Sequence, residues 1–372
     1  MIDFQKLPSP CFVLDEQLLD RNLAVIDRVR RESGAEVIVA LKACAMWSIF
    51  PELAQHSDGA TASSLAEARL VFEEFGRPAH TYAPVYTDRN IEEILDCSDH
   101  ITFNSVAQFE RFGQMALLRG ISCGLRINPG YSPVETDLYN PCVPGSRLGI
   151  PAGELKELPA GVEGLHFHVL CESRPEHLRL ALDAVEKRFG RFLDRIKWLN
   201  MGGGHLMTHK DYDCDELIRI LQEFKAKYPN LRLILEPGSA FTWRTGYLVS
   251  TVEDIVENGG VRTAMLDVSF ACHMPDCLEM PYKPAILGEP GEKGWRMGGN
   301  SCLAGDYYGD WIFDRDLRVG DRIVFEDMIH YTMVKTTMFN GVAHPAIAIV
   351  RRDGAIEIIR EFGYEDFKSR MS

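Results

Sequence analysis

A lysine, a His-Phe-His triplet, three consecutive glycines and a glutamate each close a short apolar run of this sequence. They are Lys42, His166–His168, Gly202–Gly204 and Glu236. A lysine at the end of a buried strand is partly desolvated, which lowers the pKa of its amine and frees it for Schiff-base formation. Glycine N–H groups bind phosphate, imidazoles stack on aromatic rings, and a buried carboxylate needs a partner such as a protonated ring nitrogen. These residue types indicate a site for a phosphorylated, aldehyde-bearing ring.

Each of these residues also has a simpler explanation. Lys42 can extend its amine into solvent from a strand end, and three glycines can form a tight turn. Glu236 can pair with Arg232 or Arg126, and one of the two histidines can be a core residue. Two histidines on one face of a strand can bind a metal, but no third ligand follows at suitable spacing. The combination is more specific than any member, and it predicts pyridoxal phosphate as cofactor and no metal.

A cysteine and an aspartate share a glycine-rich stretch near the C-terminus. Cys302 and Asp306 lie within Gly299–Asp306. A cysteine in such a loop is a candidate acid or nucleophile, although most cysteines are small buried apolar residues. Both interpretations stay open at this point.

Composition and charge narrow the class of protein. The 372 residues are 46% hydrophobic and 25% charged, which excludes disordered and fibrous architectures. The net charge of −14 argues against binding to nucleic acid or to an anionic membrane, and it favours cationic ligands only weakly. The ten cysteines form no CxxC pair, and neither a signal peptide nor a membrane-length apolar run occurs. We expect a cytoplasmic protein with reduced thiols.

Short apolar runs alternate with helical patterns through the first two thirds of the chain. This alternation predicts a parallel sheet, and eight such units are typical of a (β/α)8 barrel; a doubly wound open sheet is the alternative. The expected strands are 37–42, 59–63, 79–84, 100–105, 123–128, 164–169, 198–203 and 232–237, and the expected helices are 51–56, 65–76, 106–119, 174–189 and 215–228. The residues singled out above fall at the carboxyl ends of these strands, where barrel enzymes carry their active sites.

The pattern changes near Gly246. Short β-rich runs follow one another at 247–255, 262–268, 322–325, 331–337, 344–350 and 356–359. Glycine- and proline-rich turns separate them, which predicts an all-β domain. We therefore expect a barrel over residues 15–245 and a β-sandwich or β-barrel domain over 246–372, with 1–14 joining it.

The chain resembles the alanine-racemase-fold (fold type III) pyridoxal-phosphate decarboxylases, which include ornithine, arginine and diaminopimelate decarboxylases. Within that group it is most similar to the branch acting on carboxynorspermidine and carboxyspermidine, and the resemblance covers nearly the whole chain. The motifs that carry it are Ala40–Ala43, His166–Val169, Met201–Gly204, Leu235–Gly238, Gly299–Cys302 with Asp306, Tyr331, Phe339–Gly341 and, for the branch, Cys272–Cys277.

The resemblance implies a role for each matching residue. Lys42 would form the Schiff base, His168 would stack on the ring, and Glu236 would pair with the ring nitrogen. The phosphate would be held by Gly203, Gly204 and Tyr331. Cys302 would protonate the carbanion across a homodimer interface with shared active sites, and Asp276 and Asp306 would bind the distal amines of the substrate.

The implied reaction is α-decarboxylation of carboxynorspermidine or carboxyspermidine to norspermidine or spermidine, in polyamine biosynthesis. Three departures from the family pattern are Ser239, where relatives carry arginine, Leu170-Cys171 after His168-Val169, and Thr61, where ornithine decarboxylases carry aspartate. The missing arginine argues against diaminopimelate, whose second carboxylate would need a guanidinium. The alternatives are another enzyme of this fold, such as a diaminopimelate or ornithine decarboxylase or a racemase, and a cofactor-carrying regulatory protein without catalysis.

Overall fold

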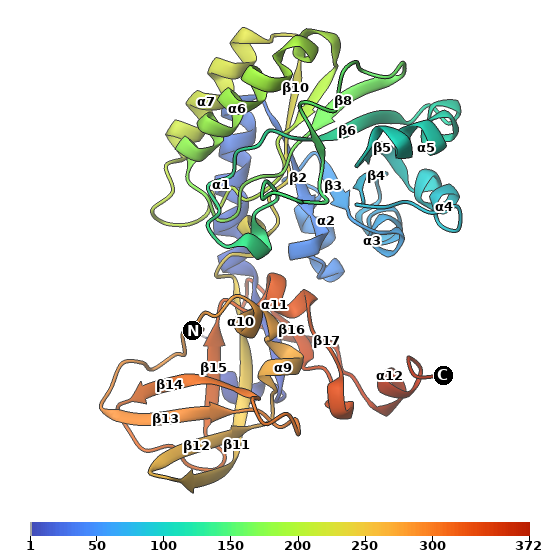
Figure 1. Cartoon of the computed structure of the whole chain (residues 1–372). Coiled ribbons are helices and arrows are strands. Elements are labelled where there is room, and N and C mark those ends of the chain that lie inside the picture. Colours follow the sequence, from blue (N-terminus) through green and yellow to red (C-terminus); the bar gives the residue numbers. More distant parts are fainter. Residues whose placement is uncertain (1) are drawn as a thin grey trace. The chain divides into compact units, whose positions relative to one another are not determined.

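The computed structural model describes residues 2–372, which divide into two compact units. One comprises residues 22–241, and the other residues 2–21 with 242–372. Figure 1 shows the chain with its elements labelled. Within residues 2–372, none of the helices combines the length and the apolar composition that a membrane span requires.

The unit of residues 22–241 is a closed barrel of eight parallel strands. Its order is β5-β4-β3-β2-β10-β9-β8-β6, and pairing between β5 and β6 closes the ring, so the open-sheet alternative is wrong. The strands are β2 (Glu36–Ala40), β3 (Gly59–Ala62), β4 (Ala79–Tyr82), β5 (Ser98–Phe103), β6 (Ser122–Asn128), β8 (Val162–His166), β9 (Trp198–Asn200) and β10 (Arg232–Leu235); the short β7 (Ile150–Pro151) extends β6. The predicted barrel is confirmed.

Helices alternate with these strands, and α6 and α7 lie side by side in Figure 1. The longer ones are α1 (Glu16–Ser33), α5 (Val106–Leu118), α6 (Pro175–Phe189) and α7 (Cys214–Lys227); the shorter ones are α2 (Phe50–Leu53), α3 (Leu65–Leu70), α4 (Ile91–Asp96) and α8 (Ser239–Thr242). Ser64, Ser105 and Asp213 cap α3, α5 and α7 by accepting a hydrogen bond from the third backbone N–H of each helix.

The sequence analysis predicted neither α1 nor α4. The sequence nevertheless contains the signals for α1. Asp15 is a residue type that caps helices, and in the structure it accepts a 2.8 Å hydrogen bond from the Gln17 N–H. Leu19, Leu23 and Ile26 then recur at helical spacing and are buried.

Trp198 fills the barrel interior because two glycines face it. A Cβ added at Gly124 or Gly164 would lie 2.2 or 2.0 Å from the indole ring. The indole N–H donates to Ser122 Oγ at 2.9 Å. Any larger residue at either glycine would have to displace the tryptophan.

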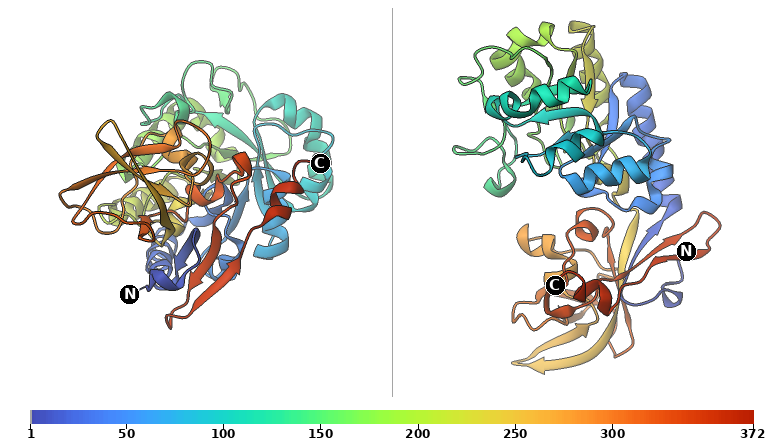
Figure 2. Two further views of the ribbon diagram at one scale, coloured as in Figure 1. Left: turned by 90° about the horizontal axis from the view of Figure 1, so that it is seen from below. Right: turned by 90° about the vertical axis from the view of Figure 1, so that its right-hand side faces the viewer.

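The second unit is a mixed β-sheet of order β14-β13-β12-β11-β1-β16-β17, with β15 paired to β11. The strands are β1 (Cys11–Asp15), β11 (Gly246–Asn258), β12 (Val261–Leu266), β13 (Lys293–Gly298), β14 (Tyr307–Phe313), β15 (Arg322–Glu326), β16 (Ala346–Val350) and β17 (Ile356–Arg360). β1 runs antiparallel to β11 and parallel to β16. The hairpin of β16 and β17 is red in Figure 2.

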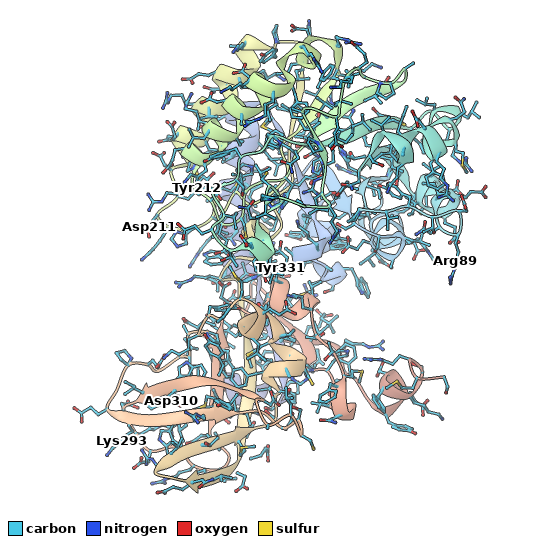
Figure 3. All side chains as sticks on the ribbon, viewed as in Figure 1. Arg89, Asp211, Tyr212, Lys293, Asp310 and Tyr331 are labelled. Atoms are coloured by element: carbon cyan, nitrogen blue, oxygen red, sulfur yellow. The ribbon has the colours of Figure 1, made fainter. Side chains whose placement is uncertain are left out.

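Two features of this unit differ from the prediction. Residues 331–337 were expected as strand, but α11 (Tyr331–Val334) begins there, while α9 (Phe270–His273), α10 (Pro275–Glu279) and α12 (Tyr364–Lys368) add further short helices. Strands β13 and β14 were not predicted; Lys293 and Asp310, labelled in Figure 3, lie on them. Trp295 of β13 lies directly opposite Trp311 of β14, and this cross-strand pair stabilises the hairpin.

Candidate active site

Lys42 lies just beyond the carboxyl end of β2, in a short turn over Leu41–Ala43. Its amine nitrogen is 3.2 Å from Nε2 of His168. Burial lowers the pKa of the Lys42 amine; the Glu236 carboxylate opposes this effect and the Arg126 guanidinium adds to it. The amine is therefore easier to deprotonate than an exposed lysine.

His168 joins the end of β8 to the glycine loop. Its Nδ1 accepts a hydrogen bond from the Gly203 N–H at 2.8 Å. Burial, reinforced by the Arg126 guanidinium and by Lys42 whenever its amine is protonated, holds the pKa of His168 well below its usual range, so the ring is neutral. Because Nδ1 accepts, the ring proton is on Nε2 and points toward the Lys42 amine. This arrangement favours an unprotonated lysine.

The glycine loop is crowded against its neighbours. Gly202 and Gly204 have φ of +70° and +90°. A Cβ at Gly203 would lie 2.3 Å from the Glu236 carbonyl oxygen, and one at Gly204 would lie 2.2 Å from the Leu170 carbonyl oxygen. The glycines are thus required by packing, beyond any contact with a phosphate. The sequence suggested the Gly203 N–H as a donor to the phosphate. In the structure this N–H donates to Nδ1 of His168.

Glu236 follows β10 and is 8% exposed. Its Oε1 accepts from Asn200 Nδ2 at 2.7 Å, and its Oε2 lies 3.5 Å from His166 Nε2. Burial raises the pKa of Glu236, but the interactions with His166, His80 and Asn200 outweigh it, so the net shift is downward and the group stays a carboxylate.

The simpler explanation of Glu236 as an arginine ion pair is wrong. Arg232 pairs with Glu36 through two bonds of 2.7 and 2.8 Å. Arg126 donates to the His168 carbonyl oxygen at 3.2 Å and lies 4.7 Å from the centre of the Tyr82 ring. Glu236 is therefore held by uncharged donors.

Sequence analysis missed two residues of this cluster, Asn200 and Tyr82. Asn200 is the last residue of β9, so its polar side chain at a strand end was the available signal. Tyr82 closes β4 in the same way. No group of three or more histidine, cysteine, aspartate or glutamate side chains within residues 2–372 is arranged to hold a metal ion.

The remaining predicted residues belong to the β-sheet unit. Asp306 accepts backbone N–H bonds from Ala271 and Ser301, at 2.9 and 3.0 Å. Cys302 is exposed, and its backbone N–H donates to Asn340 Oδ1 at 2.9 Å. Asp306 thus fixes the loop that carries Cys302.

Asp276 lies on α10, near the start of α11 where Figure 3 labels Tyr331. Its Oδ2 accepts from Tyr282 Oη and Thr332 Oγ1, both at 2.8 Å. Its Oδ1 is buried without a hydrogen-bond partner among residues 2–372. A carboxylate oxygen of this kind can accept from a cationic ligand.

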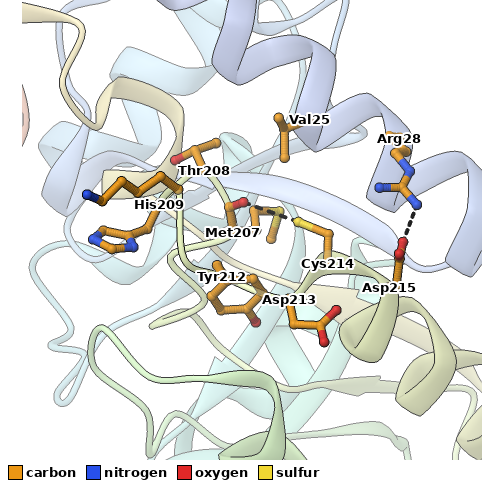
Figure 4. Close-up of a pocket in the computed structure, with 10 residues that line it drawn as sticks. Val25, Arg28, Met207, Thr208, His209, Tyr212, Asp213, Cys214 and Asp215 are labelled. Atoms are coloured by element: carbon orange, nitrogen blue, oxygen red, sulfur yellow. Dashed lines mark hydrogen bonds and ion pairs between the residues drawn. The ribbon is translucent and has the colours of Figure 1, made fainter.

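Figure 4 shows a surface pocket of the barrel unit, with a volume of about 370 Å³. It is lined by Val25 and Arg28 of α1 and by residues 207–210 and 212–215. None of the residues predicted for catalysis lines this pocket. The ion pair between Arg28 and Asp215 lies at its edge.

The geometry of Lys42, His168 and Glu236 can be compared with known proteins. Residues 11–329 match the family described as "Pyridoxal-dependent decarboxylase, C-terminal sheet domain". The chain belongs to the pyridoxal-dependent decarboxylases. The expected enzyme class and cofactor are thereby confirmed, and the fit is visible in the structure: a deprotonation-prone amine, a neutral imidazole beside it and a buried carboxylate.

The decarboxylase is similar over nearly its whole length to enzymes of named activity. It is 54% identical to the carboxyaminopropylagmatine decarboxylase of Synechocystis sp., over 98% of this chain and 96% of that one. It is 39% identical to the carboxynorspermidine/carboxyspermidine decarboxylase of Campylobacter jejuni, over 99% of each chain.

Solved structures agree. The carboxynorspermidine decarboxylase of C. jejuni, crystallised with norspermidine, superposes with a TM-score of 0.90 at 37% identity, over 98% of this chain and 100% of that one. The diaminopimelate decarboxylase of Helicobacter pylori superposes with a TM-score of 0.83 over 99% and 98% of the chains; at 19% identity this shows the shared fold alone.

Proposed function

We propose that the enzyme removes the α-carboxylate of a carboxylated polyamine precursor. The observation that carries this proposal is 54% identity over 98% of the chain to a carboxyaminopropylagmatine decarboxylase, with 39–40% to carboxynorspermidine/carboxyspermidine decarboxylases. Carboxyaminopropylagmatine is therefore the first candidate substrate. Carboxynorspermidine and carboxyspermidine, which the sequence analysis expected, are the second.

These substrates share an amino-acid end and an amine chain, and they differ at the far end. An agmatine derivative ends in a planar guanidinium, whereas the other two end in a primary ammonium. A guanidinium binds a carboxylate through two parallel hydrogen bonds, and an ammonium binds as a point charge. The substrate choice is thus a question about one end of the binding site.

In this proposal Lys42 holds the cofactor covalently, His168 stacks on its ring and Glu236 faces the ring nitrogen. When bound, pyridoxal phosphate supplies an aldehyde carbon and a ring that accepts the electron pair released with CO₂. Burial lowers the pKa of the Lys42 amine and the neutral His168 adds no competing positive charge, which favours the unprotonated, nucleophilic amine. The Glu236 carboxylate keeps a proton on the facing nitrogen, which favours decarboxylation.

The resemblance supports further assignments. We assign Gly204, Gly203 and Tyr331 to the phosphate, with Gly203 acting by shaping the loop because its N–H bonds His168. Cys302, whose side chain is exposed, is proposed to return a proton to Cα. Asp276 and Asp306 are proposed to face the substrate's cationic end.

We also propose a homodimer with shared active sites. If Lys42 and Cys302 act in one site from different subunits, mixing inactive Lys42→Ala and Cys302→Ala proteins will restore part of the activity, because each hybrid dimer has one complete site. No recovery in mixtures shown to exchange subunits would contradict this assignment.

The substrate proposal is tested by measuring CO₂ release and amine product with five compounds. They are carboxyaminopropylagmatine, carboxynorspermidine, carboxyspermidine, diaminopimelate and ornithine. We expect the highest kcat/KM for carboxyaminopropylagmatine and negligible turnover of the last two. A higher kcat/KM for diaminopimelate or ornithine would overturn the polyamine assignment, and a higher value for carboxynorspermidine would reverse the order of the candidates.

A further inference from the structure

His166 is a buried imidazole that the proposed reaction does not use. It ends β8, and 2% of it is exposed. Its Nε2 lies 3.5 Å from Oε2 of Glu236, and neither ring nitrogen makes a shorter polar contact within residues 2–372. A buried polar group without a hydrogen-bond partner costs free energy. When a native protein retains such a group, a functional role is a common reason.

The barrel register brings His166 to this carboxylate. His166 pairs with Asn200 across β8 and β9, and Asn200 pairs with Ile234 across β9 and β10, two residues before Glu236. Asn200 donates to Oε1 of Glu236 and accepts from the Gly202 N–H at 2.9 Å, which fixes the orientation of its amide. The two carboxylate oxygens therefore face two different side chains.

The imidazole plane is held by an aromatic neighbour. The ring of Tyr82 lies 5.2 Å from that of His166, and the Arg126 guanidinium covers Tyr82 at 4.7 Å. The Tyr82 hydroxyl donates to Asn104 Oδ1 at 2.9 Å. Packing on this side leaves His166 little freedom to rotate away from Glu236.

Burial keeps His166 neutral. Burial lowers the pKa of His166; Glu236 opposes this shift, while Arg126 and Lys42 add to it. His80, on β4, is also buried and neutral, because burial lowers its pKa to about 3. A neutral imidazole donates an N–H without adding a positive charge that would compete with a protonated ring nitrogen.

We propose that His166 is a positioning residue: its Nε2–H donates to Oε2 of Glu236 and, with Asn200 on Oε1, holds the carboxylate charged and aimed at the ring nitrogen of the cofactor. The 3.5 Å separation is a contact that can shorten when the site is loaded. The inference rests on the proposed role of Glu236 and is independent of the substrate.

The test loads the enzyme with pyridoxal phosphate carrying ¹⁵N in its ring and records the ¹⁵N chemical shift. We expect a protonated ring nitrogen in the unmodified enzyme and a shift toward the neutral form in His166→Phe, which keeps the aromatic packing and removes the donor. His166→Gln, which retains an N–H donor, should restore the protonated signal. For His166→Phe we expect kcat to fall about tenfold with KM unchanged, as for loss of a hydrogen bond to a charged group.

The matched control is His205→Phe, which also removes a buried neutral imidazole from the barrel unit, at a position where burial alone lowers the pKa. It should leave the ¹⁵N shift unchanged. A protonated nitrogen in His166→Phe would overturn the proposal and assign His166 to packing alone. If that variant does not fold, His166→Met, which also lacks a donor, carries the same prediction. A protonated nitrogen in Glu236→Gln would instead contradict the proposed role of Glu236, so the two failures are distinguishable.

Discussion

In the barrel, the Lys42 amine contacts the His168 ring, and the charges of Glu236 and Arg126 act on both groups. In the β-sheet unit, by contrast, Asp276 and Asp306 accept hydrogen bonds from their own neighbours, and Cys302 lies exposed on a loop. The barrel cluster is desolvated, so each group there sets the protonation state of another. Changes in the barrel should therefore affect kcat strongly and non-additively, whereas changes in the β-sheet unit should act independently of one another.

The largest effect should come from Lys42→Ala. This change removes the amine that binds the cofactor, so kcat should fall on the order of a thousandfold or more. CO₂ release at saturating cofactor is the measurement. Lys197→Ala, at an exposed ion pair of the barrel, is the control and should keep normal activity. Substantial turnover by Lys42→Ala would show that another lysine serves.

Glu236→Gln should follow, with kcat lower by about a hundredfold. The neutral amide no longer favours a protonated ring nitrogen, although it keeps the size of the side chain. The double variant Glu236→Gln/His168→Gln should lose less than the product of the two single losses, because these groups share one cluster. Fully multiplicative losses would contradict the linkage that distinguishes the barrel from the β-sheet unit.

Gly203→Ala should weaken cofactor binding by about ten- to a hundredfold. The new Cβ would lie 2.3 Å from the Glu236 carbonyl oxygen, and relieving that overlap costs about 1–3 kcal/mol. Titration of the apoenzyme with pyridoxal phosphate measures the affinity. Gly190→Ala, where no atom lies within 4 Å of the new Cβ, is the matched control and should bind normally.

Asp276→Asn should raise KM about tenfold and leave kcat within about twofold. An asparagine keeps an oxygen for Tyr282 and Thr332, but it turns the unpartnered Oδ1 into a donor that faces a cation unfavourably. Steady-state kinetics check it, with the exposed Asp314→Asn as control. A fall in kcat at constant KM would place Asp276 in the chemistry and weaken the contrast between the two units.

A separate effect concerns stability in acid rather than catalysis. The pKa of His80 is lowered from 6.5 to about 3 by burial. Between these values the unfolded chain binds a proton at this residue that the folded chain does not, so stability falls as pH drops below 6.5. The loss is at most about 1.4 kcal/mol per pH unit. His80→Phe should flatten the decline of Tm between pH 6.5 and 4; an unchanged slope would show that His80 is not held neutral.

The sequence predicted the barrel well because the parallel strands are buried on both faces and stand out as apolar runs. Lys42, His168 and Glu236 could be selected because each ends such a run. The hydrogen bond from Asn200 to Glu236 could not be predicted from the sequence, because the two side chains come together only when β9 pairs with β10.

The β-sheet unit was harder to predict. Residues 331–337 are rich in β-branched and aromatic side chains, which favour a strand, yet α11 forms there and Thr332 donates to Asp276 on α10. Strand β13 alternates poorly between buried and exposed residues, and its partner β14 identifies it only in the fold. Tertiary contacts decide the structure at both places.

The proposed attachment of the cofactor to Lys42 is the feature on which the other assignments in the barrel depend. It is tested most directly by reducing the enzyme loaded with pyridoxal phosphate with borohydride and mapping the labelled peptide by mass spectrometry. We expect a single pyridoxyl group on Lys42. A label on another lysine, or none in an enzyme that releases CO₂, would contradict it.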